Sequence, residues 1–417
     1  MSNLFPMVHW ADKASIYEVN TRQYTQEGTF NAFKKHLPRL KEMGVGILWL
    51  MPVHPISVAK RQGNLGSYYA IASYTKINPE YGTEADFKLL IEEAHKLDIK
   101  IIIDWVANHT GYDHHWTTEH PDWYVKDAAG NFTEENGWQD VIDLDYNNKD
   151  MRSQMVAAMQ YWVTEFEIDG FRCDMAHLVP LDFWKEARQQ TDSVKPLFWL
   201  AECEQVPYHD VFDVTYAWQW MHETELMITG QHTVNELYNV LHSYSQYPKG
   251  SYKMFFTSNH DENSWNGTEY DKYGNAAKAL AVFTFTWKGF PLIYSGQEIP
   301  NKRKLLFFDK DCLDWSKVTL QDFYKTLNTL HQMDAITFGE TFILPLQHHN
   351  AMGFLRRKDK EVVIVLLNFS QEYLNFTFSH EWMLGSFVNA FSGIDYKLKS
   401  TESFHLSPFN YLVYKSK

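Results

Sequence analysis

The chain has 417 residues, of which 45% are hydrophobic and 22% charged, and its 38 basic and 52 acidic residues give a formal net charge of −14 at pH 7. This composition is that of a folded globular protein and excludes a mainly disordered or fibrous chain. The acidic balance argues against nucleic acids and anionic membranes as partners, whereas a neutral ligand suits it. The aromatic content of 16% is high, and Trp and Tyr side chains suit ligands with apolar faces and polar rims, such as sugars.

The cysteines and the N-terminal segment indicate the cellular compartment. Cys173, Cys203 and Cys312 have no paired spacing, so we expect no disulfide framework and interpret Cys173 and Cys203 as small buried side chains. Residues 1–10 contain no basic stretch followed by an apolar run, which predicts no signal peptide and a cytoplasmic location. A secreted protein whose signal has been removed would show the same sequence. No run of 18 apolar residues occurs, so we expect no membrane-spanning helix.

Eight short apolar runs predict strands. Continuous apolar runs of this length are typical of strands that are buried on both faces. The first and the sixth run are the weaker candidates. In chain order the runs are 16–19, 46–50, 100–103, 171–173, 197–200, 211–216, 253–256 and 291–294.

Amphipathic segments with apolar residues every three or four positions lie between these runs and predict helices. They are residues 30–43, 84–97, 149–166, 235–244, 275–287 and 320–330. Strands that alternate with helices form right-handed βαβ units and a parallel sheet. Eight such units predict a closed (β/α)8 barrel over residues 1–340. An open doubly wound sheet is the alternative.

Two segments interrupt the alternation. Residues 109–145, after the third strand, are polar and rich in His, Trp, Asp and Gly, and we expect a short subdomain there. From residue 341 to 417 short strand-like runs follow one another without a helix, which predicts a C-terminal antiparallel, sandwich-like β-domain. The predicted strands of this domain are 352–357, 362–369, 373–378, 387–391 and 411–414.

Four carboxylates directly follow predicted strands, namely Asp104, Asp174, Glu202 and Asp261. In a barrel of this kind the C-terminal ends of the strands face the active site. Any one of these carboxylates could simply be solvated at the end of its strand, but four of them together favour an active site. Converging acids are what glycoside hydrolysis requires, since it needs a nucleophile and a general acid around a cationic transition state.

The neighbours of these acids suggest their roles. Arg172 is two residues before Asp174 and so lies on the same side of its strand, where its charge would keep Asp174 ionised as a nucleophile. Glu202 follows an apolar run, which favours the raised pKa of a general acid. His109 and His260 are suited to hydrogen-bond sugar hydroxyls.

Several motifs together resemble the α-amylase family, glycoside hydrolase family 13, and they occur along the whole chain in the order of the family. One such motif alone would be weak evidence, whereas six in order leave little room for chance. They are Gly66-Ser67-Tyr68-Tyr69-Ala70 with Asn78-Pro79-Glu80-Tyr81-Gly82-Thr83, Asp104-Trp105-Val106-Ala107-Asn108-His109, Gly170-Phe171-Arg172-Cys173-Asp174, Ala201-Glu202, Asn259-His260-Asp261 and Gly289-Phe290-Pro291-Leu292-Ile293-Tyr294-Ser295-Gly296-Gln297-Glu298.

The resemblance implies retaining cleavage or transfer at α-glucosidic bonds. It assigns Asp174 as the nucleophile, Glu202 as the acid/base and Asp261 as the carboxylate that stabilises the transition state. It also implies a set of substrate-binding residues, in which a tyrosine stacks on the sugar and Asp104 supports the sugar or the arginine. These residues are Tyr69, Asp104, His109, Arg172 and His260.

Two points of the resemblance bear on specificity and on metal binding. Many members carry Lys-His three and four residues after the nucleophile, where this chain has His177 and Leu178, so the binding of the leaving-group side is open. The chemistry requires no cofactor, but the family often holds a structural calcium ion. Its ligands would be Asn108, Asp140 or Asp143, and a backbone carbonyl near His177.

The residues and the resemblance leave three functions open. The first is α-amylase-like hydrolysis of α-1,4-glucans, the second is α-glucan transfer on the same scaffold, and the third is a non-catalytic carbohydrate-binding protein. A zinc site at His109, His114 and His115 lacks a zinc-motif spacing. The short subdomain and the end of the chain at Lys417 favour soluble maltooligosaccharides over granular starch, and we expect a monomer.

Overall fold

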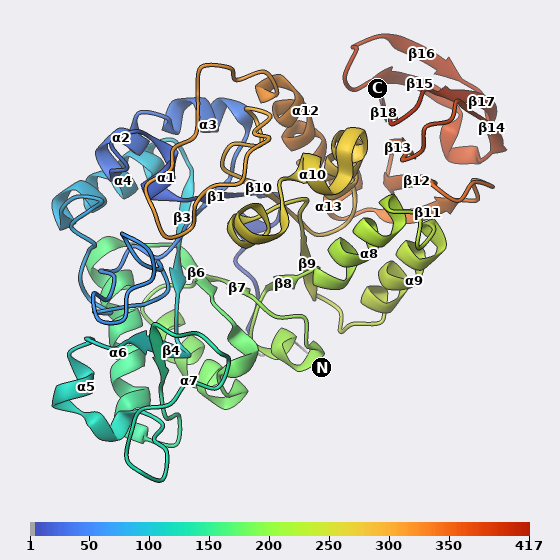
Figure 1. The fold of residues 1–417 in the computed structure, drawn as a ribbon. Helices are drawn as coiled ribbons and strands as arrows, with labels where there is room; N and C mark the ends of the chain where they lie inside the picture. Colours follow the sequence, from blue (N-terminus) through green and yellow to red (C-terminus); the bar gives the residue numbers. More distant parts are fainter. Residues whose placement is uncertain (1–4) are drawn as a thin grey trace.

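The computed structural model of the protein describes residues 5–417. The segment 1–10, for which the sequence predicts no signal peptide, therefore lies partly outside the described residues, at residues 1–4. Eight parallel strands close into a barrel in the order β1-β10-β9-β8-β7-β6-β3-β2 (Figure 1). This confirms the predicted (β/α)8 barrel over the open doubly wound sheet. The barrel strands are β1 (Ile16–Val19), β2 (Ile47–Leu50), β3 (Lys100–Trp105), β6 (Gly170–Cys173), β7 (Phe198–Ala201), β8 (Val214–Tyr216), β9 (Tyr252–Phe255) and β10 (Phe290–Tyr294).

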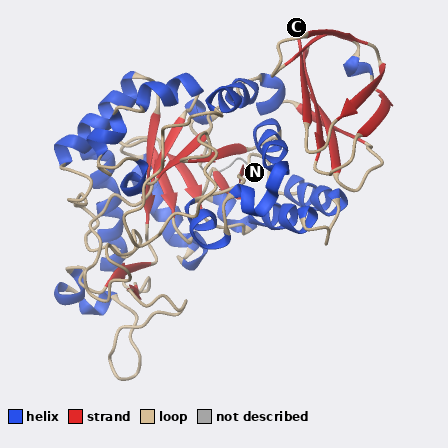
Figure 2. Cartoon of the chain, turned by 45° about the horizontal axis from the view of Figure 1, so that its top comes forward, coloured by secondary structure: helices blue, strands red, loops and turns tan. Residues whose placement is uncertain are grey.

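Helices cover the outside of the barrel (Figure 2). The predicted helix over residues 30–43 is wrong, because the segment forms two helices. Pro38, the second residue of the second helix, has no N–H to bond the carbonyl of Lys34, and its ring would clash with that carbonyl, which explains the break before it. The helices that follow from the predicted alternation, together with α7 and α8, are α2 (Phe30–Lys34), α3 (Leu37–Met43), α4 (Glu84–Lys96), α6 (Lys149–Phe166), α7 (Leu181–Asp192), α8 (Trp218–Ile228), α9 (Val234–Ser245), α11 (Ala277–Thr286) and α12 (Gln321–His331). The sequence pattern did not predict α7 and α8.

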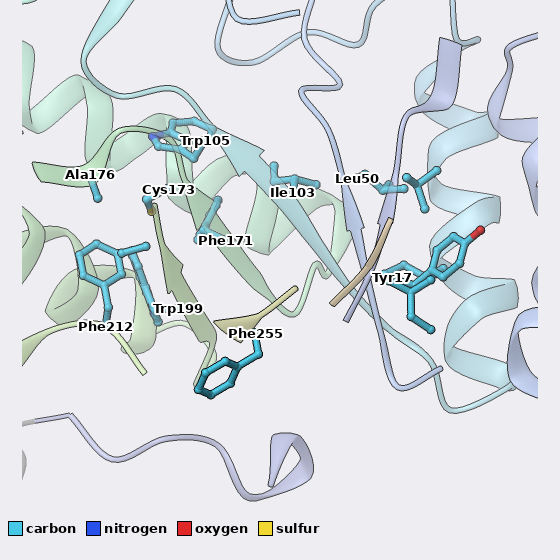
Figure 3. Packing of buried hydrophobic residues seen from close by; sticks show 14 of the residues in the cluster. Tyr17, Leu50, Ile103, Trp105, Phe171, Cys173, Ala176, Trp199, Phe212 and Phe255 are labelled. Atoms are coloured by element: carbon cyan, nitrogen blue, oxygen red, sulfur yellow. The ribbon is translucent and has the colours of Figure 1, made fainter. Parts of the chain in front are cut away.

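Side chains alternate along each barrel strand between the interior and the helices. Ile16 of β1, Ile47 of β2 and Ile102 of β3 belong to one buried cluster inside the barrel. Their neighbours, such as Tyr17 and Ile103, belong to the larger cluster between the strands and the helices, part of which is drawn in Figure 3. Because the alternation has a period of two, a polar residue two positions after an interior apolar residue also faces the interior, one layer higher.

The segment after β3 is a small projection from the barrel (Figures 1 and 2). In it β4 (His109–Gly111) pairs antiparallel with β5 (Val141–Asp143), and the short helix α5 (Trp116–Glu119) lies between them in the chain. The pairing sets His109 opposite Asp143. Further short helices are α1 (Thr21–Tyr24), α10 (Glu269–Tyr273) and α13 (Asp334–Thr337).

The C-terminal part is an antiparallel β-domain that begins at Glu340. Its larger sheet has six strands in the order β11-β12-β13-β18-β15-β16, and β14 and β17 form a second sheet. The sequence pattern did not predict β11, β16 and β17, which are largely exposed. β16 and β17 mix polar and apolar residues, and β11 has an apolar run of only three residues, 342–344. The strands are β11 (Glu340–Leu344), β12 (Ala351–Lys358), β13 (Glu361–Asn368), β14 (Leu374–Ser379), β15 (Gly385–Asn389), β16 (Asp395–Leu398), β17 (Thr401–Leu406) and β18 (Tyr411–Ser416).

Within residues 5–417 there is no helix of the length and apolar character that crossing a membrane requires.

Candidate active site

A cavity of about 500 Å³ lies at the C-terminal ends of the barrel strands. Asp174, Glu202 and Asp261 all line it, as do Tyr69 and His109. Asp174 directly follows β6 and Glu202 directly follows β7, two neighbouring strands whose parallel pairing brings the two carboxylates to the same edge. The structure therefore gathers in one cavity the three acids that the sequence selected.

Arg172 lies beneath these acids and contacts two of them. Its side chain is fully buried. One terminal nitrogen donates to Asp174 Oδ1 at 2.8 Å, and the other lies 2.7 Å from Glu202 Oε2. One guanidinium group thus spans both carboxylates and fixes their relative position. The contact with Asp174 was expected from the spacing, whereas the contact with Glu202 was not.

Asp104 supports Arg172 and does not line the cavity. Its Oδ1 accepts a hydrogen bond from the Arg172 guanidinium at 2.9 Å. Its Oδ2 accepts hydrogen bonds from the Trp49 indole and the Tyr69 hydroxyl, both at 3.1 Å. Tyr216 accepts a further hydrogen bond from Arg172 Nε at 3.0 Å. Of the two roles that the resemblance left open for Asp104, this geometry favours the support of the arginine.

His260 is also below the cavity surface, with 1% of its side chain exposed. Its Nδ1 lies 2.5 Å from Oε1 of Glu18, and its Nε2 lies 2.7 Å from the Tyr69 hydroxyl and 3.2 Å from Asp261 Oδ2. Glu18 was not among the residues selected from the sequence, although the strand alternation that puts Ile16 in the interior also puts Glu18 there.

Burial shifts the pKa values of the acids. Removal from water raises the pKa of Glu202 to about 7 and that of Asp174 to about 6, while Arg172 acts in the opposite direction on both. Partial burial raises the pKa of the Asp261 carboxyl, but the charge and hydrogen bond of His260 and the charge of Arg172 together lower it below its ordinary value. Burial also lowers the pKa of His109 to about 4, so this ring is neutral at pH 7. Arg172 does not hold the pKa of Asp174 below its usual range, because burial is the larger effect.

Aromatic side chains form the rim of the cavity. Trp138, Trp265, Phe307 and Phe308 line it, and Trp265 is half exposed and packs against Phe307 with a ring-centroid distance of 5.2 Å. Aromatic rings that line a cavity of carboxylates suit the apolar faces of sugar rings. Phe307 and Phe308 lie in the irregular segment after β10, where no sequence pattern marked them.

Of the side chains in the predicted calcium site, Asn108 and Asp143 contact each other, whereas Asp140 bonds another residue. Asp140 accepts a hydrogen bond from Gln62 at 3.0 Å, whereas Asp143 contacts the Asn108 amide and the backbone N–H of Glu135. Calcium binds six to eight oxygen atoms, and no group of three His, Cys, Asp or Glu residues in the described part of the chain is arranged to hold a metal ion. The residues as placed do not form a calcium cage, so calcium binding has no support beyond the resemblance.

The remaining candidates have structural roles. His114 is buried against Tyr74 and Trp116, so it packs in the projection rather than joining a zinc site with its neighbours. Cys173 and Cys203 are buried free thiols, in agreement with their interpretation as small core side chains.

Comparison with known proteins identifies the family. The catalytic-domain model of the family named Alpha-amylase matches residues 14–124 and 117–322. The crystal structure of a noncanonic maltogenic alpha-amylase, AmyB, from Thermotoga neapolitana is 32% identical, superposes with a TM-score of 0.90 and covers 98% of this chain and 99% of its own. An alpha-amylase from Lactobacillus plantarum is 30% identical with a TM-score of 0.89, over 98% of this chain and 100% of its own.

Curated relatives match either at lower identity or over less of the chain, and they have several activities in their names. Alpha-amylase MalA of Haloarcula japonica is 26% identical over 390 residues, which is 87% of this chain but only 56% of that protein's length. Others are named as an oligo-1,6-glucosidase and as a maltosyltransferase, so membership alone does not fix the bond that is cleaved. The family match and the nearly full-length structural likeness show that the chain belongs to the alpha-amylase family of glycoside hydrolases.

Proposed function

We propose that this enzyme hydrolyses α-1,4-glucosidic bonds in soluble maltooligosaccharides and related glucans, with retention of the anomeric configuration. The observation that carries the proposal is the pair of carboxylates, Asp174 and Glu202, held over one cavity by a single buried guanidinium group. Retaining enzymes need two carboxyls close together, at about 5–5.5 Å, with one of them protonated. The shared arginine and the higher pKa of Glu202 support this assignment.

In the first step the Asp174 carboxylate attacks the anomeric carbon and forms a covalent ester with the sugar. Glu202 donates its proton to the glycosidic oxygen as the bond between that oxygen and the anomeric carbon breaks, so the leaving chain departs as an alcohol. In the second step the Glu202 carboxylate takes a proton from water, and the oxygen of the water attacks the anomeric carbon. The ester bond breaks, Asp174 returns as a carboxylate, and Glu202 is protonated again.

Asp261 and the aromatic residues position the sugar in this scheme. Asp261 lines the cavity as a carboxylate of lowered pKa, so it remains ionised and accepts hydrogen bonds from sugar hydroxyls. Its negative charge stabilises the cationic transition state. Tyr69 and His109 line the same cavity and supply a ring face and a neutral imidazole for the bound sugar.

Glucan transfer is the second candidate, and one feature favours it. One relative is named as a maltosyltransferase. The Lys-His pair that the resemblance implies on the leaving-group side is replaced here by His177 and Leu178, which leaves the binding of an acceptor open. Transfer replaces water by a sugar hydroxyl in the second step and uses the same residues. Hydrolysis and transfer therefore use the same catalytic groups, and only their products distinguish them.

Product analysis tests the proposal. Incubation of maltoheptaose with the enzyme is expected to give shorter maltooligosaccharides with one new reducing end for each bond cleaved, whereas chains longer than the substrate would show transfer. Asp174→Asn and Glu202→Gln are each expected to lower turnover by roughly 10²–10⁴-fold without loss of the folded state. Near-wild-type turnover in either variant would overturn the assignment. Digestion of raw starch granules as efficient as that of maltoheptaose would contradict the preference for soluble chains.

A further inference from the structure

Glu18 is a buried acid beneath the proposed site that the mechanism above does not use. It is the third residue of β1, and its side chain is 0% exposed. Because it is two positions after Ile16, which packs in the barrel interior, its carboxylate points into the barrel at the level of the catalytic layer. An ionised group at such a place is costly unless it is paired.

The single charged partner in contact with Glu18, among the described residues, is His260. Oε1 of Glu18 lies 2.5 Å from Nδ1 of the His260 ring, while Oε2 has no hydrogen-bond partner in the structure. Arg172 and Asp261 act on Glu18 only through their charges, and the hydroxyls of Tyr216 and Tyr294 are the other titratable groups near it. The ion pair with His260 is thus what compensates the burial of Glu18.

The other ring nitrogen of His260 begins a chain of hydrogen bonds. Nε2 lies 2.7 Å from the Tyr69 hydroxyl, which in turn lies 3.1 Å from Asp104 Oδ2. Asp104 cannot donate as a carboxylate, so the Tyr69 hydroxyl has to donate its only proton to Asp104. Tyr69 then accepts from His260, and both ring nitrogens of His260 are required to carry a proton.

We propose that Glu18 is a positioning residue, whose buried carboxylate keeps the His260 ring doubly protonated and thereby fixes the direction of the hydrogen bonds from His260 through Tyr69 to Asp104. If His260 were neutral with its proton on Nδ1, Nε2 would accept the Tyr69 proton and Asp104 would lose this donor. Tyr69 would then no longer be held against Asp104, which also supports Arg172. The proposal rests on the function proposed above, because it concerns the supports of the same site.

Asp261 is the competing source of the charge on His260. Its Oδ2 lies 3.2 Å from Nε2, but 38% of its side chain is exposed in the cavity. Water weakens the effect of an exposed charge, whereas Glu18 acts from a dry position at a shorter distance. In the proposed reaction Asp261 also turns to sugar hydroxyls, so Glu18 is the partner that remains paired with His260 throughout the cycle. Burial lowers the pKa of His260, but the charges and hydrogen bonds of Asp261 and Glu18 together raise it well above its ordinary value.

The protonation of His260 is measured directly by ¹⁵N NMR of protein labelled in histidine, with the His260 signals assigned by their loss in His260→Gln. The wild-type ring is expected to be doubly protonated at pH 8. In Glu18→Gln, which keeps the shape but removes the charge, the ring is expected to be neutral at pH 8 and protonated at pH 5.5. In Asp261→Asn the ring is expected to remain protonated at pH 8. A neutral ring in the wild type, or a ring discharged by Asp261→Asn and not by Glu18→Gln, overturns the proposal.

Kinetics supply the second readout. The kcat/KM of Glu18→Gln on maltoheptaose is compared with that of the wild type at the same pH. It is expected to be lower by about 10-fold or more at pH 8 and by about 3-fold or less at pH 5.5. The reason is that lowering the pKa of His260 by one unit changes the protonated fraction of its ring up to tenfold. Tyr17→Phe is the matched control, because Tyr17 is the buried neighbour on β1 whose hydroxyl donates to Glu298 on the opposite side of the strand at 2.7 Å. Its pH profile is expected to match the wild type.

These measurements separate the two proposals. A Glu18→Gln loss that is equal at both pH values, or a loss of the same size in Tyr17→Phe, indicates a merely structural role and overturns the inference while the glycosidase activity stands. Absence of cleavage by the wild-type enzyme contradicts the proposed function, and the NMR result still decides the role of Glu18. If Glu18→Gln does not fold, the ring state in the wild type and in Asp261→Asn decides the question.

Discussion

Arg172 is expected to be the residue whose loss damages both stability and catalysis most. Arg172→Met removes a guanidinium that bonds Asp104 at 2.9 Å and Asp174 at 2.8 Å and lies 2.7 Å from Glu202. Removal of one partner from a buried ion pair costs about 3–5 kcal/mol, because the other charge remains buried without compensation. Divided between the carboxyls of Asp104 and Asp174, this free energy corresponds to a further rise in pKa of about one to two units in each.

The stability deficit of Arg172→Met is expected to depend on pH. Burial already raises the pKa of Asp104 and Asp174 to about 6, above the value of about 3.9 in an unfolded chain. A carboxyl with a raised folded-state pKa contributes stability below its unfolded pKa and loses this contribution as the pH rises through the folded value. Loss of Arg172 raises both folded values further, so the deficit relative to the wild type should be small at pH 4 and full at pH 8.

Calorimetric unfolding at a fixed scan rate measures this deficit, with pH 4 and pH 8 compared for both proteins. Arg188→Met is the matched control, since Arg188 is equally buried and bonds Asp213 at 2.9 Å and Asp192 at 3.1 Å on the helix side of the barrel. The control should lose stability yet keep kcat/KM below its unfolding temperature. A midpoint for Arg172→Met equal to that of the wild type at pH 8, or an equal deficit at both pH values, would refute the reasoning.

Three further outcomes are expected. The plot of kcat/KM against pH should be bell-shaped with closely spaced limbs, because Asp174, with a pKa of about 6, has to be ionised and Glu202, with a pKa of about 7, has to be protonated. The two apparent pKa values belong to the interacting pair rather than to either residue. A flat profile from pH 4 to 9 would be inconsistent with these roles. Trp265→Ala should raise KM for maltoheptaose roughly 2–10-fold with little change in kcat, as expected for a lost aromatic stack, so an unchanged KM would remove Trp265 from the binding surface. Dialysis against EDTA should leave the thermal midpoint unchanged, since Asn108 and Asp143 already bond each other; a lower midpoint that calcium restores would reveal an ion site.

The barrel was predictable because its strands are buried on both faces. Each such strand is a short apolar run, and the acid that follows the run marks the edge where the site forms. The weaker predictions show the limit of this signal. The apolar period of residues 30–43 continues through Lys35 and His36, although the backbone breaks there, before Pro38. The exposed strand β16 has no apolar run, and β11 has one of only three residues.

The acids that line the cavity, Asp174, Glu202 and Asp261, were predictable from their positions after strands. The roles of the buried residues beneath them were only partly predictable. Asp104, Arg172 and His260 were selected as substrate-binding residues, yet the structure buries all three below the cavity. Linear sequence tells on which side of a strand Arg172 lies, but not that its guanidinium reaches Glu202 on the next strand. Glu18 was detectable by strand alternation, whereas Phe307 and Phe308 depend on the path of an irregular loop.

The anomeric form of the first product tests the central claim most directly. Proton NMR during the first turnovers on maltoheptaose distinguishes the α-anomer from the β-anomer before mutarotation mixes them. Retention through the ester at Asp174 predicts that the α-anomer appears first. First appearance of the β-anomer would mean direct attack by water and would contradict the assignment of Asp174 as the nucleophile.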